Sequence, residues 1–315
     1  MNFKTSIEIT PYPFHISYHD NLLFLGSCFA ENISAYFEEL KFGVAKNPFG
    51  ILYHPKAILK SIQISLEQND NMLRDSFEYN GVWSNFHTHS DLSAISKREH
   101  IAMLEQAQSD LRHALKSSDI VFISLGTAWV YKHLGSQQTV ANCHKLPQKE
   151  FQKELLDPET TATVLGHIVG EISKINPTVK LIFTLSPVRH LKDGFVENQM
   201  SKSVLHLSIQ DVVKANTNVF YFPSYEILLD DLRDYRYYTS DFVHPNSLAL
   251  DYIWEKLKSA FFDAKTLHTL KTVLAINKRL AHRFFNPEHP DNILFQQKTK
   301  EMISDVQKKH PHIKF

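Results

Sequence analysis

The sequence predicts a three-layer α/β fold, in which helices cover both faces of a doubly wound, mostly parallel, flavodoxin-like sheet of five strands. Two observations carry this prediction. Five short runs are apolar almost throughout, which is typical of strands buried on both faces of a parallel sheet. Amphipathic helical patterns separate these runs, and such alternation of strand and helix indicates a doubly wound sheet.

The expected strands share this apolar character and are bounded by turn or polar residues. They are NLLFLG (21–26), FGVAKN (42–47), DIVFISLG (119–126), KLIFTLSPV (180–188) and NVFYFPSYEIL (218–228). The second run is the weakest strand prediction of the five. Ligands of doubly wound sheets bind beyond the carboxyl ends of the strands, so catalytic side chains are expected in the turns that follow these runs.

Helices are expected between the strands, wherever apolar residues recur at every third or fourth position. The first covers residues 28–40, with Ile33 and Phe37 on the apolar side and Glu31 opposite. The same pattern predicts helices over 54–67, 98–117, 158–175 and 200–215. Asn246 is a typical N-cap for one further helix that ends near residue 260.

Three segments fall outside this minimal core. Residues 68–97 and 127–150, with approximate bounds, are predicted insertions at strand ends, of the kind that form lids or substrate loops. Residues 263–315 are predicted to be a helical C-terminal extension with two helices around the break NPEHPDN. We therefore expect one α/β domain over 1–262, followed by this extension.

Charge and composition argue against several classes of protein. Lys and Arg total 34 and Asp and Glu total 34, so the chain lacks the basic excess typical of nucleic-acid binding. No run approaches the ~18 apolar residues of a membrane span, and the first residues do not read as a signal peptide. The two cysteines, Cys28 and Cys143, exclude a disulfide scaffold. A cytoplasmic protein that binds neither nucleic acid nor membrane is expected, and its oligomeric state stays open.

Ser27 lies between the first strand and the first helix, in the stretch LLFLGSCFAENISAYFEEL. Two interpretations are open. Serine is a favoured helix N-cap, and for Ser27 taken alone capping is the better interpretation. A serine at a helix N-terminus can also be a nucleophile whose own N–H faces a developing oxyanion.

A second stretch, YYTSDFVHPNSLALDYIWEKL, favours the nucleophile. A nucleophilic serine needs a base, and the base needs an orienting acid. Asp241 and His244 are three residues apart, so in a turn the carboxylate can reach one imidazole nitrogen and leave the other for a serine. Pro245 disfavours a helical His244, which places it on the loop before the last core helix, on the side of the sheet where Ser27 is expected. The alternative is a solvated loop that ends in the N-cap Asn246.

Several stretches together carry a family resemblance. They are GSCFA (26–30), NPFGILYHP (47–55), SLGTAWVY (124–131), VANCHKLPQKEF (140–151), TLSPVRHLKDGFVENQMSK (184–202), YFPSYEILLDDLRDYRYY (221–238) and DFVHPN (241–246). With these stretches the chain resembles the GSCFA family, which belongs to the SGNH (GDSL-type) hydrolase superfamily, over most of residues 20–260. The resemblance implies an SGNH-type fold in which Ser27 is the nucleophile, His244 the base and Asp241 its acid partner.

The resemblance also implies an oxyanion hole with three donors: the Ser27 N–H, a glycine N–H after the second strand and an asparagine side chain after the third. Gly50 matches the glycine. The asparagine is missing, because Gly126-Thr127-Ala128 stands where the superfamily has Gly-x-Asn. Candidates for the missing donor are Thr127, Asn142 and Asn47. If none donates, the hole is weaker, and the loss of one donor can lower kcat by about 10²–10³.

Further side chains have a functional and a structural interpretation each. Cys28 would point about 100° away from Ser27 on a helix, so we interpret it as packing. Arg189, His190 and Lys192 follow the fourth strand and either grip an anionic or sugar substrate or form a solvated turn. The insertions contain side chains that could bind a metal: His87 and His89, at alternate positions of an expected strand, and Cys143 and His144. Their spacing does not match that of a zinc site. Surface or substrate contacts are expected there, with neither metal nor cofactor.

These observations predict a serine esterase or acyl hydrolase with a small-molecule or glycan ester as its substrate. Removal of small acyl groups, acetyl in particular, from a carbohydrate follows from the resemblance alone. Trp83, Trp129 and Tyr131 could stack on a sugar ring, although aromatic side chains are more often core. One alternative is an O-acyltransferase that uses the same triad with a sugar hydroxyl in place of water. The other is a non-catalytic carbohydrate-binding or scaffold module on a decayed SGNH fold, which the missing asparagine favours.

Overall fold

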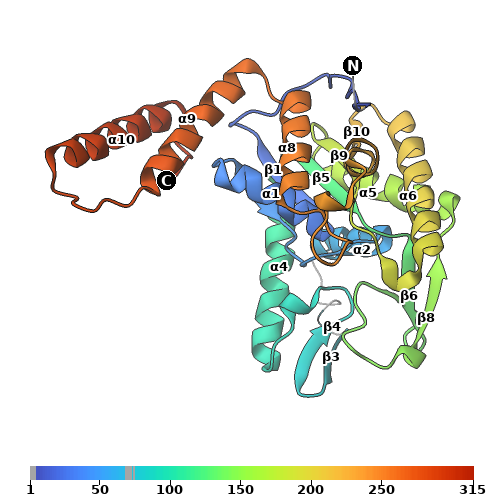
Figure 1. Ribbon diagram of the computed structural model, residues 1–315. Coiled ribbons are helices and arrows are strands. Elements are labelled where there is room, and N and C mark those ends of the chain that lie inside the picture. Colours follow the sequence, from blue (N-terminus) through green and yellow to red (C-terminus); the bar gives the residue numbers. More distant parts are fainter. Residues whose placement is uncertain (1–4, 68–72, 74) are drawn as a thin grey trace.

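The central sheet has the strand order of a flavodoxin-like fold. The computed structural model describes residues 5–67, 73 and 75–315, and its five parallel strands are ordered β10-β9-β5-β1-β2 (Figure 1). The strands are β1 Asn21–Gly26, β2 Gly43–Lys46, β5 Ile120–Leu125, β9 Lys180–Leu185 and β10 Val219–Phe222. Starting from β2, this is the order second, first, third, fourth and fifth along the chain, so the predicted fold class is confirmed.

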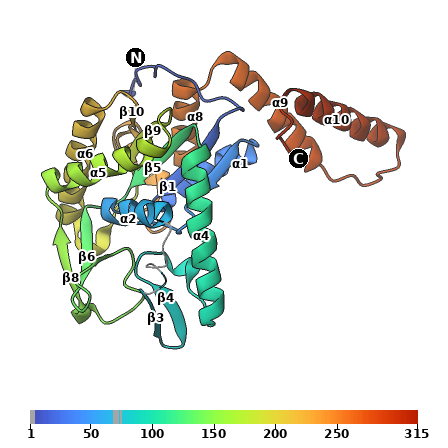
Figure 2. The same cartoon turned by 180° about the vertical axis from the view of Figure 1, so that it is seen from behind.

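Both faces of the sheet are buried, which explains why its strands are apolar throughout. Leu23 and Leu25 of β1 belong to one hydrophobic core, whereas Leu22 and Phe24 belong to the other. The first core is covered by α2 (Pro55–Leu66), α4 (Lys97–Ser117), α5 (Pro158–Ile175) and α6 (Phe195–Ala215), and the second by α1 (Cys28–Glu39) and α8 (Ser247–Phe261). Figure 2 shows the first group of helices from its own side. Asn246 caps α8 as predicted, because its side chain accepts a hydrogen bond from the N–H of Ala249.

The fifth strand is shorter than predicted. It ends at Phe222, directly before Pro223, which has no N–H for a further sheet hydrogen bond. The remaining predicted residues instead form α7 (Ser224–Glu226) and a π-helical segment, η4 (Ile227–Leu232).

The two predicted insertions carry small antiparallel sheets. The first contains a hairpin of β3 (Ser76–Tyr79) and β4 (Val82–Asn85), although its residues 68–72 and 74 lie outside the described part of the chain. The second contributes β7 (Thr139–Val140) and β6 (Trp129–His133) to a sheet in the order β7-β6-β8, whose third strand, β8 (Phe151–Leu155), lies beyond the predicted end of the insertion at residue 150. Short 3-10 turns are η1 (Ser90–Leu92), η2 (Gln148–Glu150), η3 (Leu191–Asp193) and η5 (Tyr235–Tyr237). His87 and His89 follow β4 in a turn, so their expected placement within a strand is wrong.

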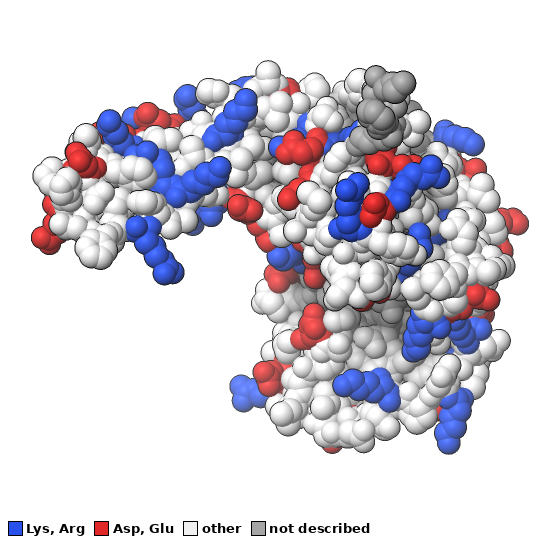
Figure 3. Space-filling view, viewed as in Figure 1, with Lys and Arg blue, Asp and Glu red and all other residues white. Residues whose placement is uncertain are grey.

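The C-terminal residues form two helices that project from the body as an arm (Figures 1 and 3). They are α9 (Ala264–Leu280), capped by Asp263, and α10 (Pro290–Lys309), capped by His289. The predicted helix-break-helix pattern is therefore present, and the division into a domain over 1–262 and an extension stays a prediction. Within the described residues, every helix is too short or too polar to cross a membrane.

Gly26 sets the spacing of β1 and β5 and generates a stability prediction. Its φ is +122°, and a Cβ atom there would lie 2.1 Å from the backbone oxygen of Ser124. We expect Gly26→Ala to lower the free energy of unfolding by more than about 3 kcal/mol, because strain and overlap add. Chemical denaturation measures this.

Gly166→Ala is the matched control, since Gly166 lies on the exposed side of α5 with open space around it. This control should raise the free energy of unfolding by about 0.5–1 kcal/mol. Equal stability of the Gly26→Ala variant and the wild type would contradict the role given to Gly26.

Candidate active site

Ser27 occupies the N-cap position of α1 but does not cap the helix with its side chain. Its φ and ψ are −72° and 171°, and the side chain makes no capping hydrogen bond. The Oγ atom lies instead 2.8 Å from Oγ of Ser124, at the end of β5, and Ser27 is only 3% exposed. The capping interpretation of this hydroxyl is therefore wrong, and the hydroxyl needs another explanation.

Asp241 and His244 form a well-organised pair on the loop before α8. Nδ1 of His244 lies 2.7 Å from Oδ2 of Asp241. The other carboxylate oxygen, Oδ1, accepts hydrogen bonds from the Thr239 hydroxyl at 2.6 Å and from the N–H groups of Val243 and His244 at 2.8 and 3.0 Å. These donors, the Thr239 hydroxyl foremost, hold the pKa of Asp241 well below its usual range. The carboxylate is thus ionised at neutral pH and orients the imidazole so that Nε2 is the nitrogen left for a proton donor.

Ser27 and His244 are present as two separate pairs. Within the described residues, the hydrogen-bond partner of Ser27 Oγ is Ser124, and His244 Nδ1 pairs with Asp241. The side chain of His244 is 45% exposed, whereas Ser27 is buried. An assembled triad would therefore require the Ser27 hydroxyl to donate its proton toward the imidazole, while it can still accept a hydrogen bond from Ser124.

The backbone donors predicted for the oxyanion hole already have acceptors. The N–H of Ser27 donates to the Ser124 carbonyl at 3.0 Å, and the N–H of Gly50 donates to the Asn47 carbonyl at 2.7 Å. Gly50 itself has a φ of +73° and no room for a Cβ atom, which would lie 2.4 Å from Cβ of His89. Asn47 fixes the turn at β1, because its Oδ1 accepts from the N–H of Gly26 at 2.8 Å.

Of the other predicted site residues, some approach the strand ends and some do not. The Thr127 hydroxyl lies 2.9 Å from the Ser201 hydroxyl and also accepts from the N–H of Trp129. Arg189 lies 6.0 Å from the ring of Tyr238, next to the Asp241 loop. His144 is bound within the insertions instead, with Nε2 2.7 Å from the Asn85 carbonyl.

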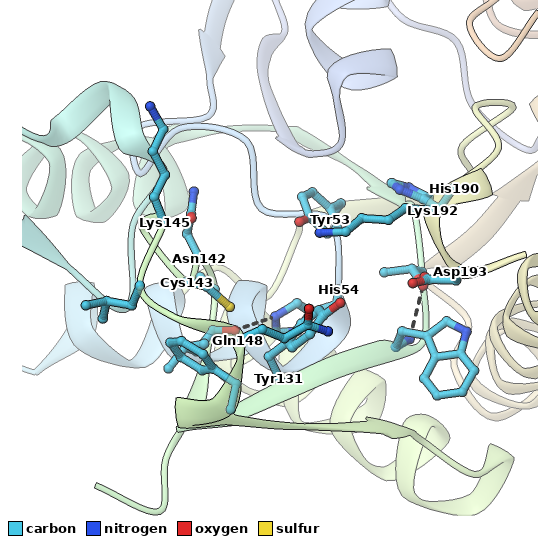
Figure 4. A pocket seen from close by; sticks show the side chains of 16 residues that line it. Tyr53, His54, Tyr131, Asn142, Cys143, Lys145, Gln148, His190, Lys192 and Asp193 are labelled. Carbon is cyan, nitrogen blue, oxygen red and sulfur yellow. Dashed lines mark hydrogen bonds between the residues drawn. The ribbon is translucent and has the colours of Figure 1, made fainter. Parts of the chain in front are cut away.

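A cavity of about 390 Å³ lies between the end of β5 and the sheet of the second insertion (Figure 4). Tyr53, Trp129 and Tyr131 supply aromatic walls, and Thr127, Asn142 and His190 are among its polar lining residues. In Figure 4, Lys192 extends toward Tyr53 from the side of His190. The volume of the cavity falls within the range of small-molecule sites.

His190 joins this cavity to the strand ends. A Cβ atom on Gly126 would lie 2.9 Å from His190 Nε2, so the imidazole rests directly on that glycine. Burial, foremost, together with the charges of Lys202 and His244, lowers the pKa of His190 to about 4. The ring is therefore neutral at physiological pH and within electrostatic reach of His244.

Sequence reasoning missed Lys202, a buried cation close to the turn that carries Cys28. Lys202 is 1% exposed and donates from Nζ to the Ser186 carbonyl at 2.7 Å. Burial lowers its pKa to about 7, and burial raises the pKa of the Cys28 thiol, which keeps that thiol protonated. A signal was available: Lys202 lies four residues after Asn198 and three before Leu205, on the apolar side of the helical pattern.

Metal-ligating side chains are scattered rather than gathered. Among the residues that the structure describes, no group of three or more His, Cys, Asp or Glu could hold a metal ion. His87 is buried and pairs with Asp75 at 3.1 Å, and burial lowers the pKa of its imidazole. Burial also raises the pKa of Cys143 to about 11, so this thiol is protonated at neutral pH.

Lys202 generates a prediction about the pH dependence of stability. Between its folded pKa of about 7 and its usual value of 10.5, the unfolded chain binds the proton that the folded chain releases, so folding stability rises with pH in this range. The wild-type free energy of unfolding, minus that of Lys202→Met, should therefore rise by about 2 kcal/mol from pH 7 to pH 9. Urea denaturation at each pH measures both proteins.

Lys214→Met, which changes an exposed lysine in the last turn of α6, is the control. The wild-type minus Lys214→Met difference should stay constant over the same range. A constant difference for Lys202→Met as well would show that Lys202 is not held in a buried, deprotonating environment.

Comparisons with known proteins give one family match and several distant structural likenesses. The model of the GSCFA family matches residues 21–257, and no curated protein matches the chain. A family 3 carbohydrate esterase of Clostridium thermocellum is similar with 10% sequence identity and a TM-score of 0.36. The match covers 81% of this chain and 98% of that chain. An acetyl xylan esterase of the rumen bacterium Butyrivibrio proteoclasticus is similar with 11% identity and a TM-score of 0.39, and the match covers 78% of this chain and 64% of that chain. A Streptococcus pneumonia protein provisionally described as a platelet activating factor is similar with 13% identity and a TM-score of 0.42, and the match covers 76% of this chain and 83% of that chain. Because the family model spans most of the sequence, the chain belongs to the GSCFA family.

Proposed function

We propose that the protein is a serine acyl hydrolase in which Ser27 is the nucleophile, His244 the general base and Asp241 its orienting acid. The observation that carries this proposal is the Asp241–His244 pair, in which one carboxylate oxygen accepts hydrogen bonds from the loop and the other lies against Nδ1 of His244. An ionised carboxylate at 2.7 Å favours the tautomer with a proton on Nδ1, and Nε2 is then free to take a proton.

The position of Ser27 supports the nucleophile. Its hydroxyl makes no capping hydrogen bond and lies at the N-terminus of α1, where the helix dipole favours negative charge. In the proposed first step, Ser27 Oγ attacks the ester carbonyl carbon and passes its proton to His244 Nε2. The carbonyl oxygen becomes an oxyanion, and Asp241 stabilises the imidazolium.

The second half of the reaction regenerates the serine. The ester C–O bond breaks, and His244 gives its proton to the departing alcohol. Water then attacks the acyl group on Ser27 while His244 takes a proton from it, and the acid leaves as Ser27 recovers its proton. The protonated state of Cys28 argues for the serine over its neighbour as nucleophile.

For the substrate, we propose a small acyl ester, acetyl in particular, of a carbohydrate or a similar hydroxylated small molecule. The cavity beside Gly126 supports this choice, because aromatic walls with interspersed amide, hydroxyl and charged groups suit the mixed apolar and polar faces of a sugar ring. Asn142, Gln148 and Asp193 supply such polar groups.

Labelling with a fluorophosphonate probe tests the nucleophile. We expect one adduct on the purified protein, mapped to Ser27 by peptide mass spectrometry. Ser27→Ala should abolish labelling, and His244→Ala should slow it by at least 10²-fold, since the base is then missing.

The matched control for His244 is His289→Ala, because His289 also faces an aspartate, Asp291 at 3.6 Å, but lies in the C-terminal arm. This variant should label at the wild-type rate. Absence of an adduct from the wild type, or an adduct that persists in Ser27→Ala, would contradict the proposal. Mass spectrometry of products with a sugar acceptor in excess distinguishes acyl transfer to the sugar from release of the free acid.

A further inference from the structure

The proposed reaction needs hydrogen-bond donors for the oxyanion, and the nearby candidates are largely engaged. The N–H groups of Ser27 and Gly50 already donate to backbone carbonyls. Asn47 links Gly26 to Glu31 through its side-chain amide, and the Thr127 hydroxyl is paired with Ser201. The position at which an asparagine is expected after β5 is Ala128, which has no side-chain donor, and the hydroxyl of the preceding Thr127 serves the local structure.

His190 supplies an unused polar atom at this place. Within the described residues, its Nε2 is buried and has no hydrogen-bond partner. A buried polar group without a partner costs free energy, so such an atom calls for a function or an unseen partner. Nε2 contacts Gly126, which follows Ser124 by two residues, and Ser124 holds the Ser27 hydroxyl.

The contact with Gly126 brings His190 to the end of β5 that also carries the Ser124–Ser27 pair. In extended backbone, residues two apart face the same side, so Gly126 faces the side toward which Ser124 points. Gly126 has no side chain, and the imidazole of His190 occupies that space.

The surroundings hold this imidazole in position. The N–H of His190 donates to Oδ1 of the buried Asn198 at 2.9 Å, and the ring packs against Tyr53 with centroids 5.3 Å apart. Tyr53 in turn accepts from the N–H of Gly126 at 2.7 Å through its carbonyl. A donor that is already fixed costs no reorganisation when charge develops, which is the requirement for an oxyanion hole.

We propose that the Nε2–H of His190 is the side-chain donor of the oxyanion hole and takes the place of the missing asparagine. This inference rests on the proposed function, because it assigns a donor to the oxyanion formed after attack by Ser27. The imidazole acts as a neutral donor and keeps its proton through the reaction. The same residue lines the cavity proposed for the substrate.

Steady-state hydrolysis of p-nitrophenyl acetate by the full chain tests this assignment. His190→Ala should lower kcat by about 10²–10³ with KM changed by less than about threefold, because the donor acts on the transition state. His190→Gln, whose amide can donate, should recover at least about tenfold of the loss. His206→Ala is the control, since His206 lies on α6 with Nε2 3.4 Å from the Glu226 carboxylate, and it should leave kcat unchanged.

Gly126→Ala provides a second variant that keeps the histidine. Its Cβ atom would displace Nε2, so kcat should fall although His190 is present. Thermal unfolding of each variant identifies those that fail to fold, and only folded variants are compared. If the folded His190→Ala and Gly126→Ala variants both keep the kcat of the wild type, the His190 assignment is overturned and the hydrolase proposal stays intact. Absence of Ser27-dependent turnover in the wild type overturns both.

Discussion

The close approach of β1 and β5 at Gly26 is the constraint on which the candidate site depends. Only a residue without a side chain fits there, since a Cβ atom would meet the Ser124 carbonyl at 2.1 Å. The same approach lets the N–H of Ser27 donate to that carbonyl and brings the two serine hydroxyls together. From β1 the chain continues to β2 on one side of the sheet and then crosses to β5 on the other side. The contact between β1 and β5 therefore lies at the switch point where ligands of such sheets bind.

The site combines a buried half and an exposed half. Ser27, Lys202 and the Nε2 atom of His190 are withdrawn from solvent, whereas Asp241 and His244 lie on an open loop. Burial keeps the buried groups neutral or less basic, while hydrogen bonds keep Asp241 ionised. The two halves therefore differ in charge state at neutral pH, with a neutral imidazole at His190 and an ionised carboxylate at Asp241.

Most of the fold follows from sequence patterns, because burial on both faces of a parallel sheet leaves a continuous apolar run. The patterns fail where a single residue overrides them, as Pro223 does at the end of β10. Asn246 is predictable as a cap because capping is local. The hydroxyl contact of Ser27 is not, since Ser124 lies 97 residues away along the chain.

The candidate site shows the same division. The Asp241–His244 pair could be predicted because its two residues lie three positions apart in one turn. The position of His190 on Gly126 depends on how the loop after β9 packs over β5, which no local pattern encodes. Lys202 lies between these cases, because helical spacing indicates a buried side although not what faces the ammonium.

Trapping of the acyl-enzyme tests the central claim most directly. The wild-type protein is mixed with p-nitrophenyl acetate, quenched in acid within the first turnover and digested, and the acetylated residue is located by mass spectrometry. The account predicts an acetyl group on Ser27 that is missing from His244→Ala at the same time point. Acetylation of Cys28, or an acetyl group that accumulates equally without His244, would contradict it.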